Sequence, residues 1–436
     1  MTTGRGFYGH EQIRIPHDSS VRVAIDARIP QGEWGGVQQV VEGLASGLSR
    51  LEGDEEYVFL VSADAGEWLR SNVGGGCRLV EVPSSMGKSG RRRAFDKVSS
   101  ISPRLGSIAS QLGPALGRAS IPIPKSDGFV ESLGVDLVHF VTPQGFITSL
   151  SSIYQPHDLL HVHLPETLSP LRRAYRERAY REFSRRAEFV ATMTEWGRTD
   201  LCQQLGLHPA RVAVIPWAPV ATVEARTADG DPSRTMIGAP DRFLIYPAQT
   251  WQHKNHERLL EAIALLSSEG MRIDLVCTGR LNDHFRVIRR RLRELRLESQ
   301  VRFLGYVSAE DLAGLYQRAT ALVFPSLFEG WGLPVVEAFA FGLPVASSRA
   351  TVLPEVAGGA ALLFDPLDTR AIADSIASIW TDEPLRRSLR DRGLVRASKL
   401  SWDRTARTFR ALYRTVAGRD LTREDRDLLA PPTLIS

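Results

Sequence analysis

Two glutamates, Glu329 and Glu337, bracket a loop of two glycines, a tryptophan and a proline in the stretch EGWGLPVVE. A carboxylate accepts paired hydrogen bonds from vicinal hydroxyls, and glycines let the backbone of residues 330–333 approach a ligand closely. One alternative is that the glycines only permit a turn and that Glu337 only suits the positive end of a helix. With Glu329 facing the same loop, the spacing favours a ligand that is anionic in the middle and hydroxylated at both ends, such as a nucleotide sugar.

A short helix is predicted directly after this loop. Pro334 introduces the apolar run VVEAFAF, which stops at Gly342, and proline at the start with glycine just past the end is typical of a helix. Its first-turn N–H groups, at Val335, Val336 and Glu337, would have no partner within the helix. Together with the helix dipole, these donors could hold an anion at the mouth of a cleft.

Strand-like runs alternate with amphipathic helical segments along both halves of the chain, which is typical of the α/β class with parallel sheets. In the first half the expected strands lie at residues 21–28, 57–62, 136–141, 188–193 and 212–216. In the second half they lie at residues 243–248, 273–279, 301–305, 321–326, 343–348 and 361–366. Ligands of open α/β sheets bind at the carboxyl ends of strands, and both glutamates follow one such end.

The length of 436 residues fits two domains of about 200 residues each. A polar stretch between Val220 and Asp241, rich in Gly, Pro and Asp, has neither helical nor strand periodicity. We therefore expect an N-terminal domain, a linker, a C-terminal domain and a final helix with its tail, over residues 1–222, 223–240, 241–401 and 402–436. Residues 84–134 form a basic insertion in the first domain, either a solvated, mobile segment or a contact for an anionic membrane surface or an acceptor.

The composition, with 43% hydrophobic and 24% charged residues, is that of an ordinary globular protein and excludes the disordered and fibrous classes. A net charge of +4 is too small to predict nucleic-acid binding, although it suits an anionic ligand or membrane surface. Cys77, Cys202 and Cys277 are far apart, so no disulfide framework or CxxC metal site is predicted and a reducing cytosol is the simplest location. Without a signal-peptide-like start or an 18-residue apolar run, any membrane contact is expected to be peripheral.

The segment HDLLH, residues 157–161, places two histidines one helical turn apart, as in zinc-binding helices. Pro156 and Pro165 argue against a stable helix there, and an aspartate stands where that motif has a glutamate. No metal site is therefore predicted. A histidine with apolar neighbours is often a satisfied core residue, which is one reading of His157.

The stretches EGWGLPVVEA, FGLPVASS and LPEVAGGAALLFDP together resemble the signature of the retaining glycosyltransferases of family 4. The resemblance runs through most of the C-terminal half. It implies the GT-B fold, in which two doubly wound, Rossmann-like domains face each other across a cleft and the last helix crosses back to the N-terminal domain. Glu329 and Glu337 match the family's two glutamates, which implies that Glu329 contacts the donor sugar and Glu337 the ribose hydroxyls.

Other segments resemble the same family. YPAQTWQHKNH places Lys254 where the family binds the donor diphosphate, and the HD pair places His157 at the donor sugar or acceptor. The implied catalytic residues are therefore Glu329, Lys254 and His157. Many members have an arginine where this chain has Gln249, so Lys254, the helix terminus or another arginine such as Arg280 would carry more of the diphosphate binding.

The resemblance also implies a base pocket and a second glycine-rich loop. VRFLGYVS is similar to the strand and loop that line the nucleobase, where main-chain groups of Leu304 and Tyr306 would read the base. Gly35 and Gly36 resemble the glycine-rich loop that faces the diphosphate or acceptor across the cleft. Trp331 either shapes the sugar pocket or packs against a neighbouring strand. The loop beside the first glutamate adds four donor-binding residues: Gly330, Trp331, Gly332 and Leu333.

The function implied by the resemblance is a retaining, metal-independent transfer without a cofactor. The donor would be a nucleoside diphosphate sugar, with GDP-mannose as the first choice, and the acceptor a hydroxyl of a glycan, a lipid-linked molecule or a small molecule. No nucleic-acid partner is expected. We expect a bacterial cytoplasmic enzyme of surface-polysaccharide biosynthesis, with peripheral contact at the inner face of the membrane as a further option. The open alternatives are a GT-B sugar-nucleotide epimerase or phosphorylase, and a non-catalytic nucleotide-sugar-binding subunit.

Overall fold

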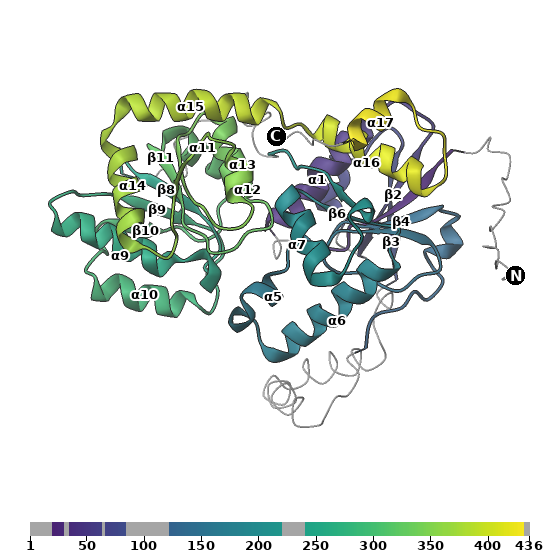
Figure 1. Cartoon of the computed structure of the whole chain (residues 1–436), viewed down its shortest axis with the longest axis horizontal. Coiled ribbons are helices and arrows are strands. Elements are labelled where there is room, and N and C mark those ends of the chain that lie inside the picture. The colour runs from purple at the N-terminus through teal and green to yellow at the C-terminus, as the bar shows by residue number, and fades with distance from the viewer. Residues whose placement is uncertain (1–19, 30–34, 63–65, 84–121, 220–239, 431–436) are drawn as a thin grey trace, which may run out of the picture.

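The computed structural model describes residues 20–29, 35–62, 66–83, 122–219 and 240–430. Residues 84–121 of the predicted insertion, and the predicted linker except for residue 240, lie outside this described part. The chain forms two lobes, each built on its own parallel sheet, which lie side by side in Figure 1. The prediction of an α/β fold with two doubly wound, Rossmann-like domains is confirmed.

The N-terminal lobe is built on a seven-stranded sheet in the order β3-β2-β1-β4-β5-β6-β7. Its inner strands are apolar because helices cover both faces of a parallel sheet. β1 shows this, with Val23, Ala24 and Ile25 all fully buried. The strands are β1 (Arg22–Asp26), β2 (Glu56–Ser62), β3 (Cys77–Val82), β4 (Leu137–Phe140), β5 (Ser151–Tyr154), β6 (Phe189–Thr192) and β7 (Val212–Val214).

Helices pack on both faces of this first sheet. Val40, Val41 and Leu44 of α1 bury against one face, whereas Tyr180 and Phe183 of α6 belong to a separate apolar cluster on the other. The helices and 3-10 turns here are α1 (Gly35–Ser49), α2 (Glu67–Arg70), η1 (Glu131–Leu133), α5 (Leu160–His163), η2 (Pro165–Thr167), α6 (Pro170–Arg186), α7 (Glu195–Leu205) and η3 (Pro209–Arg211). Among the described helices of the whole chain, none is both long and apolar enough to cross a bilayer.

The C-terminal lobe is built on a six-stranded parallel sheet in the order β10-β9-β8-β11-β12-β13. The strands are β8 (Leu244–Pro247), β9 (Leu275–Thr278), β10 (Val301–Phe303), β11 (Ala321–Phe324), β12 (Val345–Ser348) and β13 (Leu362–Phe364). The helices are η4 (Gln252–Lys254), α9 (His256–Ser268), α10 (Phe285–Glu294), α11 (Ala309–Arg318), α12 (Leu333–Ala340), α13 (Leu353–Ala357), α14 (Thr369–Thr381) and α15 (Glu383–Ser398). Strands β8 and β11 are hydrogen-bonded neighbours, so the loops that follow them meet at one edge.

Three segments differ from the prediction. Strand β5, which lies between β4 and β6, is absent from the expected strands because only four residues form it and two of them are serines. Strand β3 has no counterpart among the expected strands, because it is an edge strand with a largely half-exposed surface and charged residues such as Arg78 and Glu81. Within the predicted insertion, residues 122–134 are attached to the first sheet: Val130 is fully buried and Lys125 pairs with Ile147 in an isolated bridge, although several side chains there are exposed. The two interpretations of the insertion, a solvated segment and a contact for a membrane surface or an acceptor, therefore still apply only to residues 84–121.

The last helices, α16 (Trp402–Val416) and α17 (Arg423–Leu429), lie on the N-terminal lobe in Figure 1. Helix α16 packs on α1, where a Cβ atom at Gly43 would overlap the indole ring of Trp402. Arg414 pairs with the buried carboxylates of Glu55 and Asp425. The crossing of the last helix back to the N-terminal domain is thus seen directly.

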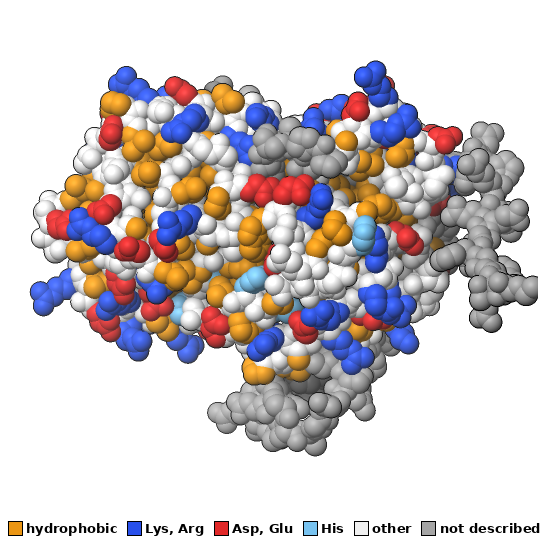
Figure 2. All heavy atoms as spheres, in the orientation of Figure 1, with side chains coloured by type: hydrophobic (Ala, Val, Ile, Leu, Met, Phe, Trp, Pro, Cys, Tyr) orange, Lys and Arg blue, Asp and Glu red, His pale blue; other side chains and the backbone are white. Residues whose placement is uncertain are grey.

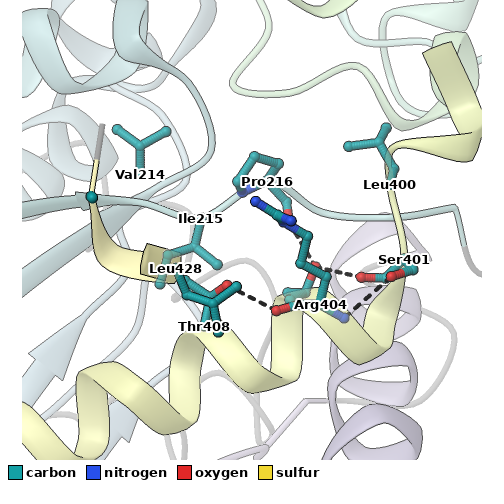
Figure 3. Close-up of a pocket in the computed structure, with 10 residues that line it drawn as sticks. Val214, Ile215, Pro216, Leu400, Ser401, Arg404, Thr408 and Leu428 are labelled. Carbon is teal, nitrogen blue, oxygen red and sulfur yellow. Dashed lines mark hydrogen bonds between the residues drawn. The ribbon is translucent and has the colours of Figure 1, made fainter. Parts of the chain in front are cut away.

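A small pocket lies where this crossing meets the end of β7. Figure 3 shows Val214, Ile215 and Pro216 on one side, with Arg404 and Thr408 of α16 on the other. The hydroxyl of Thr405 donates a hydrogen bond to the carbonyl of Pro216 at 2.8 Å. None of the predicted site residues lines this pocket, so it is a feature of the tether and not of the candidate active site.

Candidate active site

Lys254 and Glu329 meet at the carboxyl edge of the C-terminal sheet. Lys254 ends η4, shortly after β8, and Glu329 follows β11, so the pairing of these two strands brings both side chains together. The Nζ atom of Lys254 lies 2.5 Å from Oε1 of Glu329, and the two side chains are only 17% and 11% exposed. Partial burial strengthens their attraction relative to a surface ion pair. The residues implied for the diphosphate and the sugar are therefore direct neighbours.

The backbone of Glu329 is held on both sides by Thr351. The hydroxyl of Thr351 donates to the carbonyl of Glu329 at 3.1 Å and accepts from its N–H at 3.2 Å. Thr351 itself has a φ of 51°, a left-handed conformation that is strained for a β-branched residue. The sequence analysis missed this residue, because nothing in the local sequence marks a threonine that will adopt positive φ.

Glu337 is enclosed in the C-terminal domain and is 2% exposed. One of its oxygens accepts a hydrogen bond from the hydroxyl of Tyr316 at 2.8 Å, while Oε1 has no hydrogen-bond partner within the described residues. Burial raises the pKa of Glu337 from 4.5 to about 7, although the bond from Tyr316 favours the ionised form. A buried carboxylate oxygen without a partner is costly, so this group is suited to accept hydrogen bonds from a ligand.

Helix α12 begins at Leu333, one residue earlier than predicted, with Gly332 as its N-cap at a φ of 91°. The N–H of Val335 donates to the carbonyl of Gly332 at 2.9 Å, so the prediction that it is free for an anion was wrong. Because the helix starts earlier, the N–H of Glu337 also falls beyond the first turn. Within the described residues, no partner occurs for the N–H groups of Gly332 and Leu333, which are the donors left for an anion.

Two glycines allow this loop to touch the N-terminal domain. A Cβ atom at Gly330 would collide with the carbonyl oxygen of His157, and one at Gly36 would lie 3.4 Å from the side chain of Leu333. Gly330 is therefore needed for close approach of two backbones across the domain boundary. Gly35 and Gly36 were predicted in a loop, but α1 already begins at Gly35, so they open the helix instead.

His157 follows β5 with a φ of 68°, a rare conformation for a residue with a side chain. Its Nε2 lies 2.7 Å from the carbonyl oxygen of Val141, and its ring packs edge-on to Trp217 with centroids 5.0 Å apart. Burial lowers the pKa of His157 to about 4, so the imidazole is neutral at pH 7 and donates to that carbonyl. The backbone conformation fixes the ring at the domain boundary.

A pocket lies at this boundary. Phe328, Glu329 and Gly330 line it from the C-terminal domain, while the loop after β5 and the first turns of α7 line it from the N-terminal domain. His157 is among its lining residues, so two of the three implied catalytic residues, His157 and Glu329, border one space, and Lys254 does not line it. The ring of Phe328 stacks on His163, with centroids 5.1 Å apart.

None of the other residues predicted for the diphosphate and base, Gln249, Arg280, Leu304 and Tyr306, lines this pocket. The side-chain oxygen of Gln249 accepts from the indole N–H of Trp251 at 3.1 Å, and Arg280 is exposed. The N–H of Leu304 donates to the carbonyl of Cys277 at 2.9 Å, so that donor cannot read a base as predicted; it continues the sheet instead. Tyr306 is 71% exposed.

Trp331 is 3% exposed and belongs to the main apolar core, which corresponds to the packing alternative rather than to a sugar-contacting surface. In the HDLLH segment, the helical turn α5 begins at Leu160 and excludes His157, so the two histidines are not on one helix. Within the described residues, no group of three or more His, Cys, Asp or Glu side chains lies close enough to hold a metal ion. Cys77, Cys202 and Cys277 are free thiols.

Comparisons with known proteins agree with this geometry. The family model "Glycosyl transferases group 1" matches residues 232–395, and "Glycosyl transferase 4-like domain" matches residues 35–218. The chain is 31% identical over 257 residues to O-antigen chain mannosyltransferase B of Escherichia coli, covering 57% of this chain and 66% of the relative. It is 28% identical over 288 residues to D-inositol 3-phosphate glycosyltransferase of Corynebacterium diphtheriae, covering 60% and 66%. The matched region thus spans just under two thirds of these relatives.

Solved structures show the same fold at low sequence identity. HepE of Anabaena, in complex with UDP and glucose, superposes with a TM-score of 0.66 at 17% identity, over 91% of this chain and 100% of that one. WaaG, a glycosyltransferase involved in lipopolysaccharide biosynthesis, superposes with a TM-score of 0.61 at 17% identity, over the same 91% and 100%. With the two family models covering one domain each, the chain belongs to the family 4 type of GT-B glycosyltransferases.

Proposed function

We propose that this protein transfers a sugar from a nucleoside diphosphate sugar to a hydroxyl group of a glycan or lipid-linked acceptor. The observation that carries the proposal is the contact between Lys254 and Glu329 at the start of α12. It joins a cation suited to a diphosphate with a carboxylate suited to sugar hydroxyls, at the strand edge where ligands of such sheets bind.

The departing diphosphate is the group that most needs stabilising. As the bond from the anomeric carbon to the diphosphate oxygen breaks, negative charge grows on that oxygen. Lys254 and the N–H groups of Gly332 and Leu333 supply preorganised positive potential there. Lys254 then shares its charge between Glu329 and the phosphate, so donor binding loosens the ion pair and frees Glu329 to accept from the sugar hydroxyls.

We further propose that Glu337 accepts hydrogen bonds from the ribose hydroxyls of the nucleotide. Its unpartnered Oε1 and its burial support this assignment. Two ribose donors would favour the ionised carboxylate and lower its pKa in the complex. The energy lost on burying this carboxylate in the free protein is thereby recovered when nucleotide binds.

Retention of configuration and independence from metal are also proposals, supported by the family resemblance. In a same-face substitution the acceptor oxygen forms its bond to the anomeric carbon on the side from which the diphosphate leaves. The acceptor's proton passes to the departing phosphate oxygen, so atoms and charge balance without a protein nucleophile. Neutral His157 would orient sugar or acceptor from the opposite domain and would take no proton.

GDP-mannose is the proposed first donor. Several E. coli relatives are named mannosyltransferases, among them the serotype-specific mannosyltransferase WbdA, which is 35% identical over 170 residues but is matched over only 21% of its length. The solved HepE structures, by contrast, contain UDP or UDP-glucose. A thermal-shift screen with GDP, UDP and ADP decides the base, because specific binding raises the unfolding temperature.

A cytoplasmic location with peripheral contact at an anionic membrane surface is proposed as well. Helix α6 supports it, because its outward side carries arginines in a region where Figure 2 shows many Lys and Arg side chains. Some of these arginines pair with Glu177 or Glu182, which reduces the free charge. The exposed arginines of α6 are Arg172, Arg173, Arg178, Arg181, Arg185 and Arg186. Binding to vesicles with and without anionic lipid tests the proposal.

The decisive assay measures release of nucleoside diphosphate with and without acceptor. A glycosyltransferase releases nucleotide in proportion to acceptor glycosylated, a phosphorylase requires inorganic phosphate, and an epimerase changes the sugar nucleotide with no second substrate. A binding subunit retains nucleotide affinity without turnover. Acceptor-independent epimerisation, or tight binding without any transfer across a panel of glycan acceptors, would overturn the proposed function.

A further inference from the structure

A carboxylate of the C-terminal domain caps a helix of the N-terminal domain. Glu355, on α13, accepts the N–H of Glu195 at 2.8 Å through Oε1 and the N–H of Trp196 at 2.9 Å through Oε2. These are the first two residues of α7, whose N–H groups have no partner within the helix. Thr194 already caps α7 through the N–H of Gly197 at 2.9 Å, so Glu355 completes the cap from 160 positions along the chain.

Glu355 belongs to the segment that also holds the donor loop. Four residues before it, Thr351 bonds both backbone groups of Glu329. Behind it, the buried Arg396 donates to the backbone carbonyls of Glu355 and Val356, which fixes the end of α13. One short, anchored segment therefore connects Glu329 with the N-terminal domain.

On its other side, α7 forms a wall of the pocket between the domains. Trp196 and Asp200 of α7 line that pocket together with Glu329. Trp196 packs edge-on to Phe328, with ring centroids 6.2 Å apart, and the carboxylate of Asp200 lies 2.8 Å from Nε2 of His163. Helix α7 lies on the side of the N-terminal lobe that faces the C-terminal lobe in Figure 1.

We propose that Glu355 is a positioning residue that locks α7 against the donor loop and so sets the acceptor side of the active site. The charged carboxylate, two backbone donors and the positive end of α7 make one strong, directional contact between the domains. The inference rests on the proposed glycosyl transfer for its catalytic consequence, but the contact itself can be tested without any turnover.

Hydrogen exchange of the α7 amides tests the contact. In Glu355→Ala, peptides covering residues 194–200 should exchange at least tenfold faster, and Glu355→Gln should be intermediate because its single carbonyl oxygen accepts from one N–H. Asp368→Ala is a matched control, since Asp368 accepts from the N–H groups of Arg370 and Ala371 at 2.8 and 3.1 Å within the C-terminal domain. Equal exchange in all three variants and the native protein would overturn the proposal.

Steady-state kinetics tests the positioning role. Glu355→Ala should lower acceptor kcat/KM by about 10- to 100-fold, since small misplacements of reacting groups are costly, and should raise the share of donor lost to hydrolysis. The dissociation constant of the nucleotide, which binds the C-terminal domain, should change less than twofold. Faster α7 exchange with unchanged acceptor kinetics would refute positioning, whereas absence of transfer in the native protein would refute only the proposed function. If Glu355→Ala does not fold, hydrogen exchange and acceptor kinetics are measured on Glu355→Gln instead.

Discussion

The two glutamates on either side of the α12 start lie in opposite electrostatic surroundings. Glu329 is in contact with the ammonium group of Lys254, whereas among the described residues the Glu337 carboxylate forms no ion pair and accepts one hydrogen bond, from the hydroxyl of Tyr316. Both side chains are largely enclosed, so the difference does not come from exposure. It comes from the partner that each carboxylate has in the free protein.

This difference indicates two ways to prepare a carboxylate for the same ligand. In the proposed donor site Glu329 already has a cation in contact, and Lys254 would give up part of that contact to a diphosphate. Burial raises the pKa of Glu337 to about 7, so its ionised form is less favoured than that of an exposed carboxylate and would be stabilised by hydrogen-bond donors of a ligand. Under the proposed function, an ion-paired carboxylate and a buried carboxylate with a raised pKa would bind one donor from two sides.

Among the substitutions that test this comparison, removing Lys254 should cause the largest loss of activity. Lys254→Ala leaves the departing diphosphate without its cation and leaves Glu329 unpaired, so we expect kcat to fall by about 10²- to 10³-fold. Lys254→Arg should recover part of the loss. The exposed Lys399 provides the matched control as Lys399→Ala. Initial rates of nucleotide release measure the effect, and a loss below threefold with normal thermal unfolding would contradict the assignment.

Gly330→Ala distinguishes the contributions of the two glutamates, because it should displace Glu329 and leave Glu337 in place. The added Cβ would strike the carbonyl oxygen of His157, so the donor loop must retreat from the N-terminal domain. We expect kcat/KM to fall by about 100-fold. In Gly314→Ala, at a helical glycine with open space around its Cβ position, activity should be native and stability should rise by up to about 1 kcal/mol. Equal behaviour of the two variants would contradict the close-approach argument.

Glu337→Gln tests whether burial raises the pKa of this carboxylate. The folded-state pKa lies above the ordinary value of 4.5, so the group supports folding fully below pH 4.5 and this support is lost as the pH rises through about 7. An amide cannot ionise, so at pH 8 the free energy of unfolding should rise by about 2 kcal/mol, after allowing for a weaker bond from Tyr316. Denaturant unfolding measures it. No gain at pH 8, or the same gain at pH 4, would contradict the pKa shift.

The pH dependence of nucleotide binding should be the smallest effect. If ribose hydroxyls bind the ionised form of Glu337, affinity is highest above pH 7 and falls as protonation competes at lower pH. Between pH 8 and pH 6 the dissociation constant should rise about tenfold. Calorimetric titrations measure it, with Glu337→Gln as the reference that removes the titration of the nucleotide itself. The same slope in both proteins would show that Glu337 is not the titrating group.

The fold was predictable because buried parallel strands are continuous apolar runs. The runs at β1, β8 and β11 were each located, while β3 escaped because an edge strand with Arg78 and Glu81 has no such run. The order in which strands neighbour one another was not derivable from spacing. It required the GT-B resemblance.

Within the site, the sequence located local motifs but not the contacts that form on folding. Lys254 and Glu329 each follow a strand, so their meeting was foreseeable from the family's spacing. The contact of Thr351 with Glu329 requires a strained backbone at Thr351, and the contacts of Glu355 require partners in the other domain. Neither can be recognised from the adjacent sequence. The N–H of Val335 was assigned wrongly because the left-handed Gly332 moved the start of the helix.

The packing of α16 on α1 has a consequence for biosynthesis. Residues 35–49 leave the ribosome long before Trp402, whose indole fills the space beside Gly43. The N-terminal domain therefore cannot bury that face of α1 until the C-terminal domain between them has been synthesised, and this long-range closure should follow the folding of both sheets. Until then, the face of α1 at Gly43 and Gly47 lacks the helix that covers it in the folded protein.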